Sequence, residues 1–116
     1  MGVEELSEAE QVVLLSLVGL MARADGSVSD SEMGALQSLR EAIGPGRFER
    51  VRDAAAQVEG PAAIMAGAKQ VTRPEARETV FAAIVELAAP DVIDENEAAL
   101  IERLAELWGL ASPFSE

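Results

Sequence analysis

A chain of 116 residues is long enough for one domain with a modest hydrophobic core. It contains no cysteine and no histidine, which excludes disulfides, thiolate chemistry, zinc knuckles and the commonest general base. The formal net charge of −12 argues against nucleic acid or an anionic membrane as a partner.

Helix-capping motifs mark the expected helix starts. Each motif places Ser, Thr or Asp three residues before Glu, so that each residue can bind the other's backbone N–H. In chain order these motifs occupy residues 7–10, 29–32, 72–75 and 94–97. Helix stops are expected where glycine or proline interrupts the pattern, at residues 44–46, 60–61, 90 and 109.

Between these signals, apolar residues recur every three to four positions, which is the spacing of a helix that buries one face. In chain order, the stripes run over residues 13–21, 33–43, 48–58, 64–68, 80–87 and 100–108, with the fourth helix expected at about residues 61–71. No stretch alternates with the period of two that is typical of a strand. The sequence therefore predicts an all-α fold: a compact single-domain bundle of about six helices over residues 1–116.

The chain also contains an internal repeat at an offset of 65 residues. The stretch at residues 20–24 aligns with residues 85–89, and residues 28–32 align with residues 93–97. The two copies share the same order of apolar stripe, turn, capping motif and closing glycine. We therefore predict two pseudo-repeated helix-turn-helix units that flank a central helical pair and pack together.

The stretch RADGSVSDSEM, between the first two expected helices, partly matches a calcium-binding EF-hand loop. Placing Asp25 at the fifth loop position puts Gly26 and Glu32 at their proper positions. The first and third positions then fall on Met21 and Arg23, which cannot coordinate calcium. A standard EF-hand is therefore excluded.

Two interpretations of this acidic turn remain open. In the first it is only a capped turn, in which Ser29 and Glu32 start the next helix. In the second the two repeated turns lie side by side, and their crowded carboxylates bind a hard cation such as Ca²⁺ or Mg²⁺. The candidate ligands of this weak site are Asp25, Asp30, Glu32, Asp91, Asp94 and Glu97.

The same residues carry a resemblance to the TerB-like domain family, which includes the tellurite-resistance protein TerB and the N-terminal domain of the DjlA co-chaperone. The family pattern, A-D-G-x-[VI]-x-x-x-E in each half and an ending near L-G-L, is matched by Ala24, Asp25, Gly26, Val28 and Glu32, then by Ala89, Ile93 and Glu97, and approximately by Trp108, Gly109 and Leu110. The resemblance covers nearly the whole chain.

This resemblance implies an all-helical domain, linked to bacterial stress and tellurite resistance, with no established catalytic activity. It also implies a divalent-metal site made by acidic turn residues. By motif position that site carries over to Asp25, Glu32 and Glu97. Pro90 stands in the place of the second turn's aspartate, and Asp91 follows it by one position.

The expected role is therefore a non-enzymatic binding or scaffold module in the cytoplasm. An enzyme would have to rely on carboxylates, because Ser16 is expected to bond back to a helix carbonyl rather than to act as a nucleophile. The acidic N-terminus does not resemble a basic secretory signal. The longest apolar run, residues 12–22, is shorter than the roughly 20 residues of a bilayer-spanning helix.

The alternative is a metal-free interaction module that docks a protein partner, or a second copy of itself, through charge-polarised faces. Both ends of the chain are acidic, whereas residues 40–77 are mildly basic. Such a basic segment more often balances nearby acids on a solvated face. If it docks an acidic partner, the candidate contact residues are Arg47, Arg50, Arg52, Arg73 and Arg77.

Overall fold

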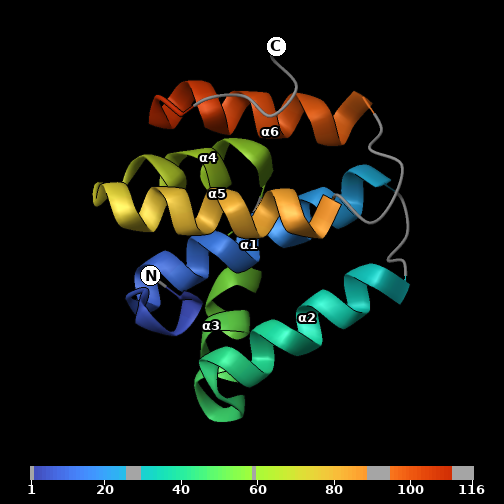
Figure 1. Ribbon diagram of the computed structural model, residues 1–116, viewed down its shortest axis with the longest axis vertical. Coiled ribbons are helices and arrows are strands. Elements are labelled where there is room, and N and C mark those ends of the chain that lie inside the picture. Colours follow the sequence, from blue (N-terminus) through green and yellow to red (C-terminus); the bar gives the residue numbers. More distant parts are fainter. Residues whose placement is uncertain (1, 26–29, 59, 89–94, 111–116) are drawn as a thin grey trace.

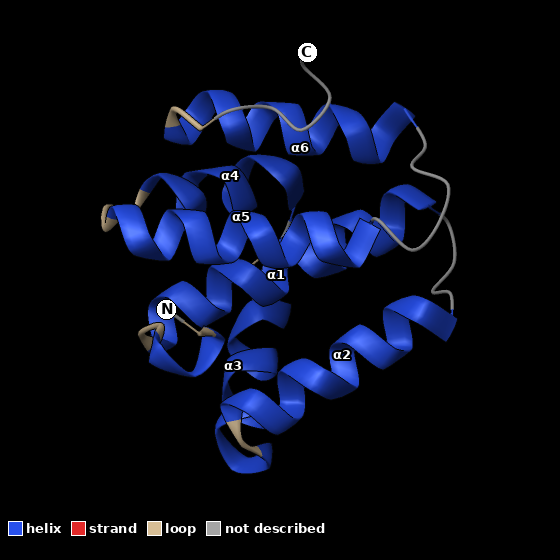
Figure 2. Ribbon diagram, viewed as in Figure 1, coloured by secondary structure: helices blue, strands red, loops and turns tan. Residues whose placement is uncertain are grey.

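The computed structural model describes residues 2–25, 30–58, 60–88 and 95–110 (Figures 1 and 2). These residues contain one 3₁₀ turn and six α-helices, and no strand occurs among them, which confirms the all-α prediction. The elements are η1 (Val3–Glu5), α1 (Glu8–Asp25), α2 (Asp30–Ile43), α3 (Pro45–Ala56), α4 (Gly60–Lys69), α5 (Pro74–Ala88) and α6 (Glu95–Trp108). None of the described helices is long and apolar enough to cross a lipid bilayer.

Helix α1 is the centre of the molecule, and it lies against α3, α4, α5 and α6 (Figure 1). Helices α5 and α6 lie along each other, as expected for a helix-turn-helix unit. Helix α2 instead leads away from α1 and packs on α3. The two repeated units therefore differ in how far their second helix departs from the first.

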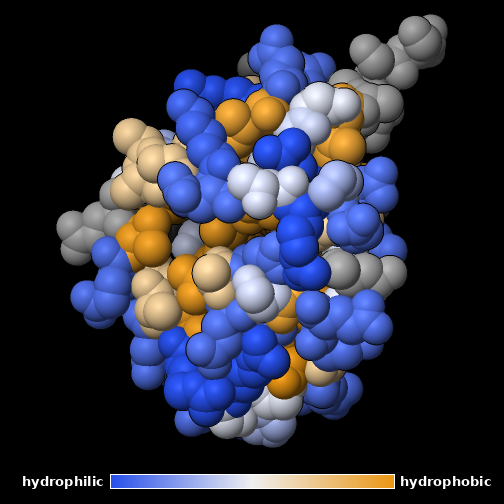
Figure 3. All heavy atoms as spheres, turned by 90° about the vertical axis from the view of Figure 1, so that its left-hand side faces the viewer, coloured by the Kyte–Doolittle hydropathy of each residue, from blue (hydrophilic) through white to orange (hydrophobic). Residues whose placement is uncertain are grey.

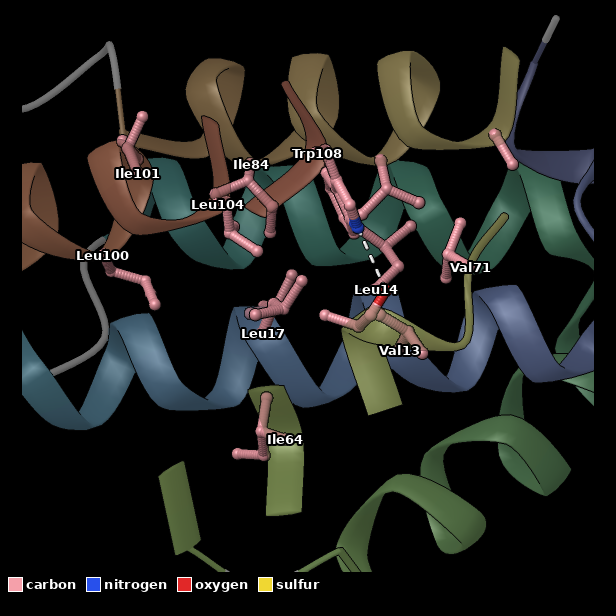
Figure 4. Close-up of a cluster of buried hydrophobic side chains, with 14 of the residues drawn as sticks. Val13, Leu14, Leu17, Ile64, Val71, Ile84, Leu100, Ile101, Leu104 and Trp108 are labelled. Atoms are coloured by element: carbon pink, nitrogen blue, oxygen red, sulfur yellow. Dashed lines mark hydrogen bonds between the residues drawn. The ribbon is translucent and has the colours of Figure 1, made fainter. Parts of the chain in front are cut away.

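The main hydrophobic core lies between α1 and the layer formed by α4, α5 and α6 (Figure 4). Leu14 and Leu17 of α1 are fully buried there, together with Ile84 of α5 and Leu104 of α6. The Trp108 indole N–H donates a hydrogen bond of 3.0 Å to the Ala68 carbonyl, which joins the end of α6 to α4. The predicted stripes of these helices therefore face one common core.

A second, smaller core joins α1, α2 and α3. This cluster of buried side chains combines Leu15 of α1 with Phe48 and Val51 of α3, and Ile43 at the end of α2 completes it. Apolar residues also show between hydrophilic ones on the face drawn in Figure 3, as is ordinary for the surface of a folded protein. The end of α2 is thus anchored, whereas Met33 near its start is 57% exposed.

The capping motif at residues 7–10 is confirmed. The Ser7 backbone N–H donates to Glu10 Oε1 at 2.8 Å, and the Glu10 backbone N–H donates to Ser7 Oγ at 3.2 Å. The predicted stop at Gly109 is also confirmed, because its φ of +67° lets the Leu110 N–H donate to the Ala105 carbonyl at 2.8 Å.

The expected start of α5 was wrong by one residue, because the motif at residues 72–75 made Thr72 the capping residue. Helix α5 begins at Pro74, and the Arg73 carbonyl accepts the N–H of Arg77 at 3.0 Å, so that Arg73 rather than Thr72 precedes the helix. Proline is well suited to a first helical position, where no N–H partner is needed.

The predicted stop at residues 44–46 is confirmed, because α2 ends at Ile43. Helix α3 begins directly afterwards, at Pro45, and Gly44 between the two helices has a φ of +100°. The motifs at residues 29–32 and 94–97 begin outside the described residues.

Replacing Ser7 with alanine is expected to lower the free energy of unfolding by about 1 kcal/mol, because it removes the cap of the central helix. A urea titration, monitored by circular dichroism, measures this change. Thr72→Ala is the matched control, since Thr72 does not cap α5, and we expect its effect to stay within about 0.5 kcal/mol. Equal losses in both variants would contradict the assigned cap.

Candidate functional site

Four of the six candidate acidic residues stand at helix ends on one side of the molecule. Asp25 is the last residue of α1 and Asp30 the first of α2, whereas Glu32 and Glu97 are the third residues of α2 and α6. The C-terminal end of α1 and the N-terminal ends of α2 and α6 all lie toward the right in Figure 1. This is the arrangement of helix ends that a site shared by the two turns requires.

The carboxylates themselves lie outside what the structure describes. Asp91 and Asp94 are outside the described residues, and so are the side chains of Asp25, Asp30, Glu32 and Glu97. Among the side chains that are described, no group of three or more acids could hold a metal ion. The cation site therefore stays a prediction.

Two of the candidate arginines contact Glu8 at the start of α1. Arg50 Nη2 lies 2.9 Å from Glu8 Oε1, and Arg47 Nε lies 3.8 Å from the same oxygen. Arg47 also donates through Nη2 to the Leu6 carbonyl at 3.3 Å. These contacts fix α3 against the N-terminal end of α1.

Arg73 forms a paired contact with Glu10, the residue that also closes the capping box of α1. Arg73 Nε donates to Glu10 Oε2 at 3.0 Å, and Nη2 donates to Oε1. Hydrogen bonding to Arg73 lowers the pKa of Glu10 against the opposing effect of burial, and the Ser7 N–H lowers it further. The same pair raises the pKa of Arg73. Glu10 is therefore an ionised carboxylate that joins α1 to the start of α5.

The remaining two candidate arginines differ from each other. Arg77 Nε donates to the Val71 carbonyl at 2.8 Å and so closes the chain between α4 and α5. Arg52 is exposed on α3 and has no hydrogen bond or ion pair to any described residue. The structure thus gives four of the five candidate arginines partners within the chain, whereas Arg52 has none in the part of the chain that is described.

A cavity of about 490 Å³, which the sequence did not predict, lies among α1, α2, α3 and α4. In Figure 1 the first three of these helices bound a triangle, with α1 above, α2 at the lower right and α3 at the left. The floor of the cavity is formed by four buried side chains: Leu15 and Val18 of α1, Phe48 of α3 and Ile64 of α4. The cavity thus lies between α1 and α2, the helix that leads away from it.

The polar groups around the cavity are few. The Ser16 hydroxyl donates to the Val12 carbonyl at 2.8 Å, which confirms the expected back-bond and leaves the hydroxyl without a proton for other acceptors. Gln37 and Arg40 of α2 and Arg52 of α3 also line the cavity. No aspartate or glutamate is among its described lining residues, although acids dominate the whole chain.

One sequence signal could have indicated this cavity. The apolar stripe of α2 begins at Met33 and Leu36, but burial along it is complete only at Ile43. A stripe longer than its neighbour can cover leaves apolar surface at one end. Gly19, at the facing position of α1, adds space, because a Cβ built there meets no atom within 4 Å.

The chain was compared with protein families, curated proteins and solved structures. A family model described as "Tellurite resistance protein TerB" matches residues 11–113. The searches of curated proteins and of solved structures found no match. The matched range includes both acidic turns, all five candidate arginines and the cavity.

Proposed function

Because this chain belongs to the TerB family, we propose that it is a non-enzymatic binding or scaffold module in a bacterial stress or tellurite-resistance type of system. The observation that carries this proposal is the family match over residues 11–113. The chemistry of the described residues supports it. The Ser16 hydroxyl donates its hydrogen bond to a helix carbonyl, and contact with Arg73 keeps Glu10 ionised. Neither group is therefore activated for catalysis.

We further propose that the acidic turns bind one Ca²⁺ or Mg²⁺ ion weakly. The helix ends that carry Asp25, Asp30, Glu32 and Glu97 support this, because they lie on the same side of the molecule. Carboxylate oxygens are the ligands that these hard cations prefer, and a cation relieves the repulsion among like charges. Asp91 and Asp94 complete the proposed ligand set.

The test is calorimetric titration of chelator-treated protein with calcium and then with magnesium. We expect saturable binding near one ion per chain, with the affinity lowered at least tenfold in Asp25→Asn and in Glu32→Gln. Glu49→Gln is the control, because it removes the same charge from an exposed position on α3. Bound metal should also raise the melting temperature.

The opposite result is equally informative. If neither metal gives heat above dilution, and chelator leaves the melting temperature unchanged, RADGSVSDSEM is only a capped turn. The same conclusion follows if Glu49→Gln weakens binding as much as Asp25→Asn does. The proposed module would then act without metal.

A metal-free module that docks through its charged faces is the alternative function. Internal contacts of four candidate arginines weigh against it. Arg50 and Arg73 are paired with carboxylates of the chain, and Arg47 and Arg77 donate hydrogen bonds to its carbonyls. Charge-driven self-association would weaken steeply as salt rises. Sedimentation at low and high ionic strength distinguishes this alternative.

A further inference from the structure

We propose that the cavity among α1, α2, α3 and α4 binds a small amphiphilic carboxylate of the fatty-acid class. Its hydrocarbon chain would lie against the buried floor, and its carboxylate would lie between Arg40 and Arg52. This inference goes beyond the scaffold role, and none of the acidic candidate ligands is among the described residues that line the cavity.

The size and lining of the cavity suit an apolar chain. A volume of about 490 Å³ falls within the range of small-ligand sites, roughly 300–1,000 Å³. The floor residues Leu15, Val18, Phe48 and Ile64 are all buried and carry no polar side-chain atom. A hydrocarbon chain laid on these side chains would remove their apolar surface from water, which favours binding.

The polar part of the cavity lining suits an anion. Arg40 of α2 and Arg52 of α3 both line it, and neither has a hydrogen bond or ion pair to a described residue. By contrast, Arg50 and Arg73 are paired with carboxylates of the chain. Two guanidinium groups that are unpaired with any described residue, at a largely apolar site, can provide the charge-assisted hydrogen bonds that a carboxylate accepts.

The depth of the floor favours a thin occupant over a partner helix. The floor belongs to helices that also form the two cores, so it lies below the surface of the bundle. A docked helix is about 10 Å wide and would reach that floor only with single side chains. Met33, exposed on α2 beside the cavity, is a flexible side chain that can fold over a bound chain.

The experiment is calorimetric titration of chelator-treated full-length protein with decanoate, and separately with uncharged decanol. We expect saturable binding of one decanoate per chain, and binding of decanol at least tenfold weaker. The double variant Arg40→Gln/Arg52→Gln should bind decanoate at least tenfold more weakly. Arg40→Gln/Arg50→Gln is its charge-matched control and should retain more of the affinity, because Arg50 does not line the cavity.

Gly19→Leu tests the cavity itself without unfolding the protein. The glycine lies within α1 and its surroundings are open, so that the new side chain should fill the cavity and favour the helix. We expect loss of decanoate binding with an unchanged or raised melting temperature. Gly34→Leu is the matched control, because Gly34 is an exposed helical glycine of α2 outside the cavity lining, and it should bind as the natural chain does.

Three results would overturn the proposal: no saturable binding of decanoate, equal affinity in the Arg40→Gln/Arg52→Gln variant, or equal loss in Gly19→Leu and Gly34→Leu. Binding of an acidic amphipathic peptide, but not of decanoate, would assign the cavity to a partner helix and would also overturn it. Because the titration is done in chelator, its outcome does not depend on the cation site.

Discussion

Leu17→Ala is expected to lower the free energy of unfolding by about 3 to 5 kcal/mol, the cost of truncating a fully buried leucine. Leu17 lies in the middle of α1 and contributes to the core that α1 shares with α4, α5 and α6 (Figure 4). Domains of this size have a total stability of about 5–15 kcal/mol. The variant should therefore be marginally folded, with an urea midpoint well below that of the natural chain.

Two controls separate the loss of packing from the change of residue type. Met33→Ala removes a side chain that is 57% exposed, and we expect a loss of no more than about 0.5 kcal/mol. Leu17→Met keeps most of the buried volume and should cost less than about 1.5 kcal/mol. If Leu17→Ala and Met33→Ala destabilise the protein equally, α1 is not the centre of the core.

Arg73→Gln is expected to lower the free energy of unfolding at neutral pH by about 1 to 3 kcal/mol, because it leaves the buried Glu10 carboxylate without its charged partner. Glu10 retains its capping bonds with Ser7, which limits the loss. Arg50→Gln is the control. Its partner Glu8 is half exposed, so that the pair should contribute no more than about 1 kcal/mol.

The loss caused by Arg73→Gln should depend on pH in a defined direction. Contact with Arg73 lowers the pKa of Glu10 in the folded chain below its ordinary value of 4.5. The pair therefore stabilises the fold fully above that pH, and its contribution disappears as the pH falls through the lower, folded-state pKa. The difference between the natural chain and Arg73→Gln should thus be constant near neutrality and shrink below about pH 4.5. A difference that grows on acidification would contradict this account.

The sequence predicted the helices well because their signals are local. The capping box at Ser7 and the glycine stop at Gly109 each depend on residues within one helical turn, and both are confirmed. The start of α5 was misplaced by one residue for the same reason. The local pattern made Thr72 the cap, whereas the helix begins at Pro74, a residue that fits a first helical position, directly after Arg73.

The candidate sites were harder to predict because their contacts are distant in sequence. Arg50 and Glu8 are 42 residues apart, and Arg73 and Glu10 are 63 apart. The period of a stripe shows that a helix face is apolar, but not whether another helix covers it. For that reason Met33 and Ile43 looked equivalent in the sequence, although one borders a cavity and the other is buried.

The hydrogen bond between Trp108 and Ala68 gives the protein a built-in optical probe. The chain has one tryptophan and no tyrosine, so its near-ultraviolet emission comes almost entirely from a single indole. That indole is buried at the junction of α4 and α6, and it is not among the residues that line the cavity. A red shift of its fluorescence would therefore report opening of that junction. Comparing this shift with the loss of helical circular dichroism during unfolding would show whether the two cores come apart together or in sequence.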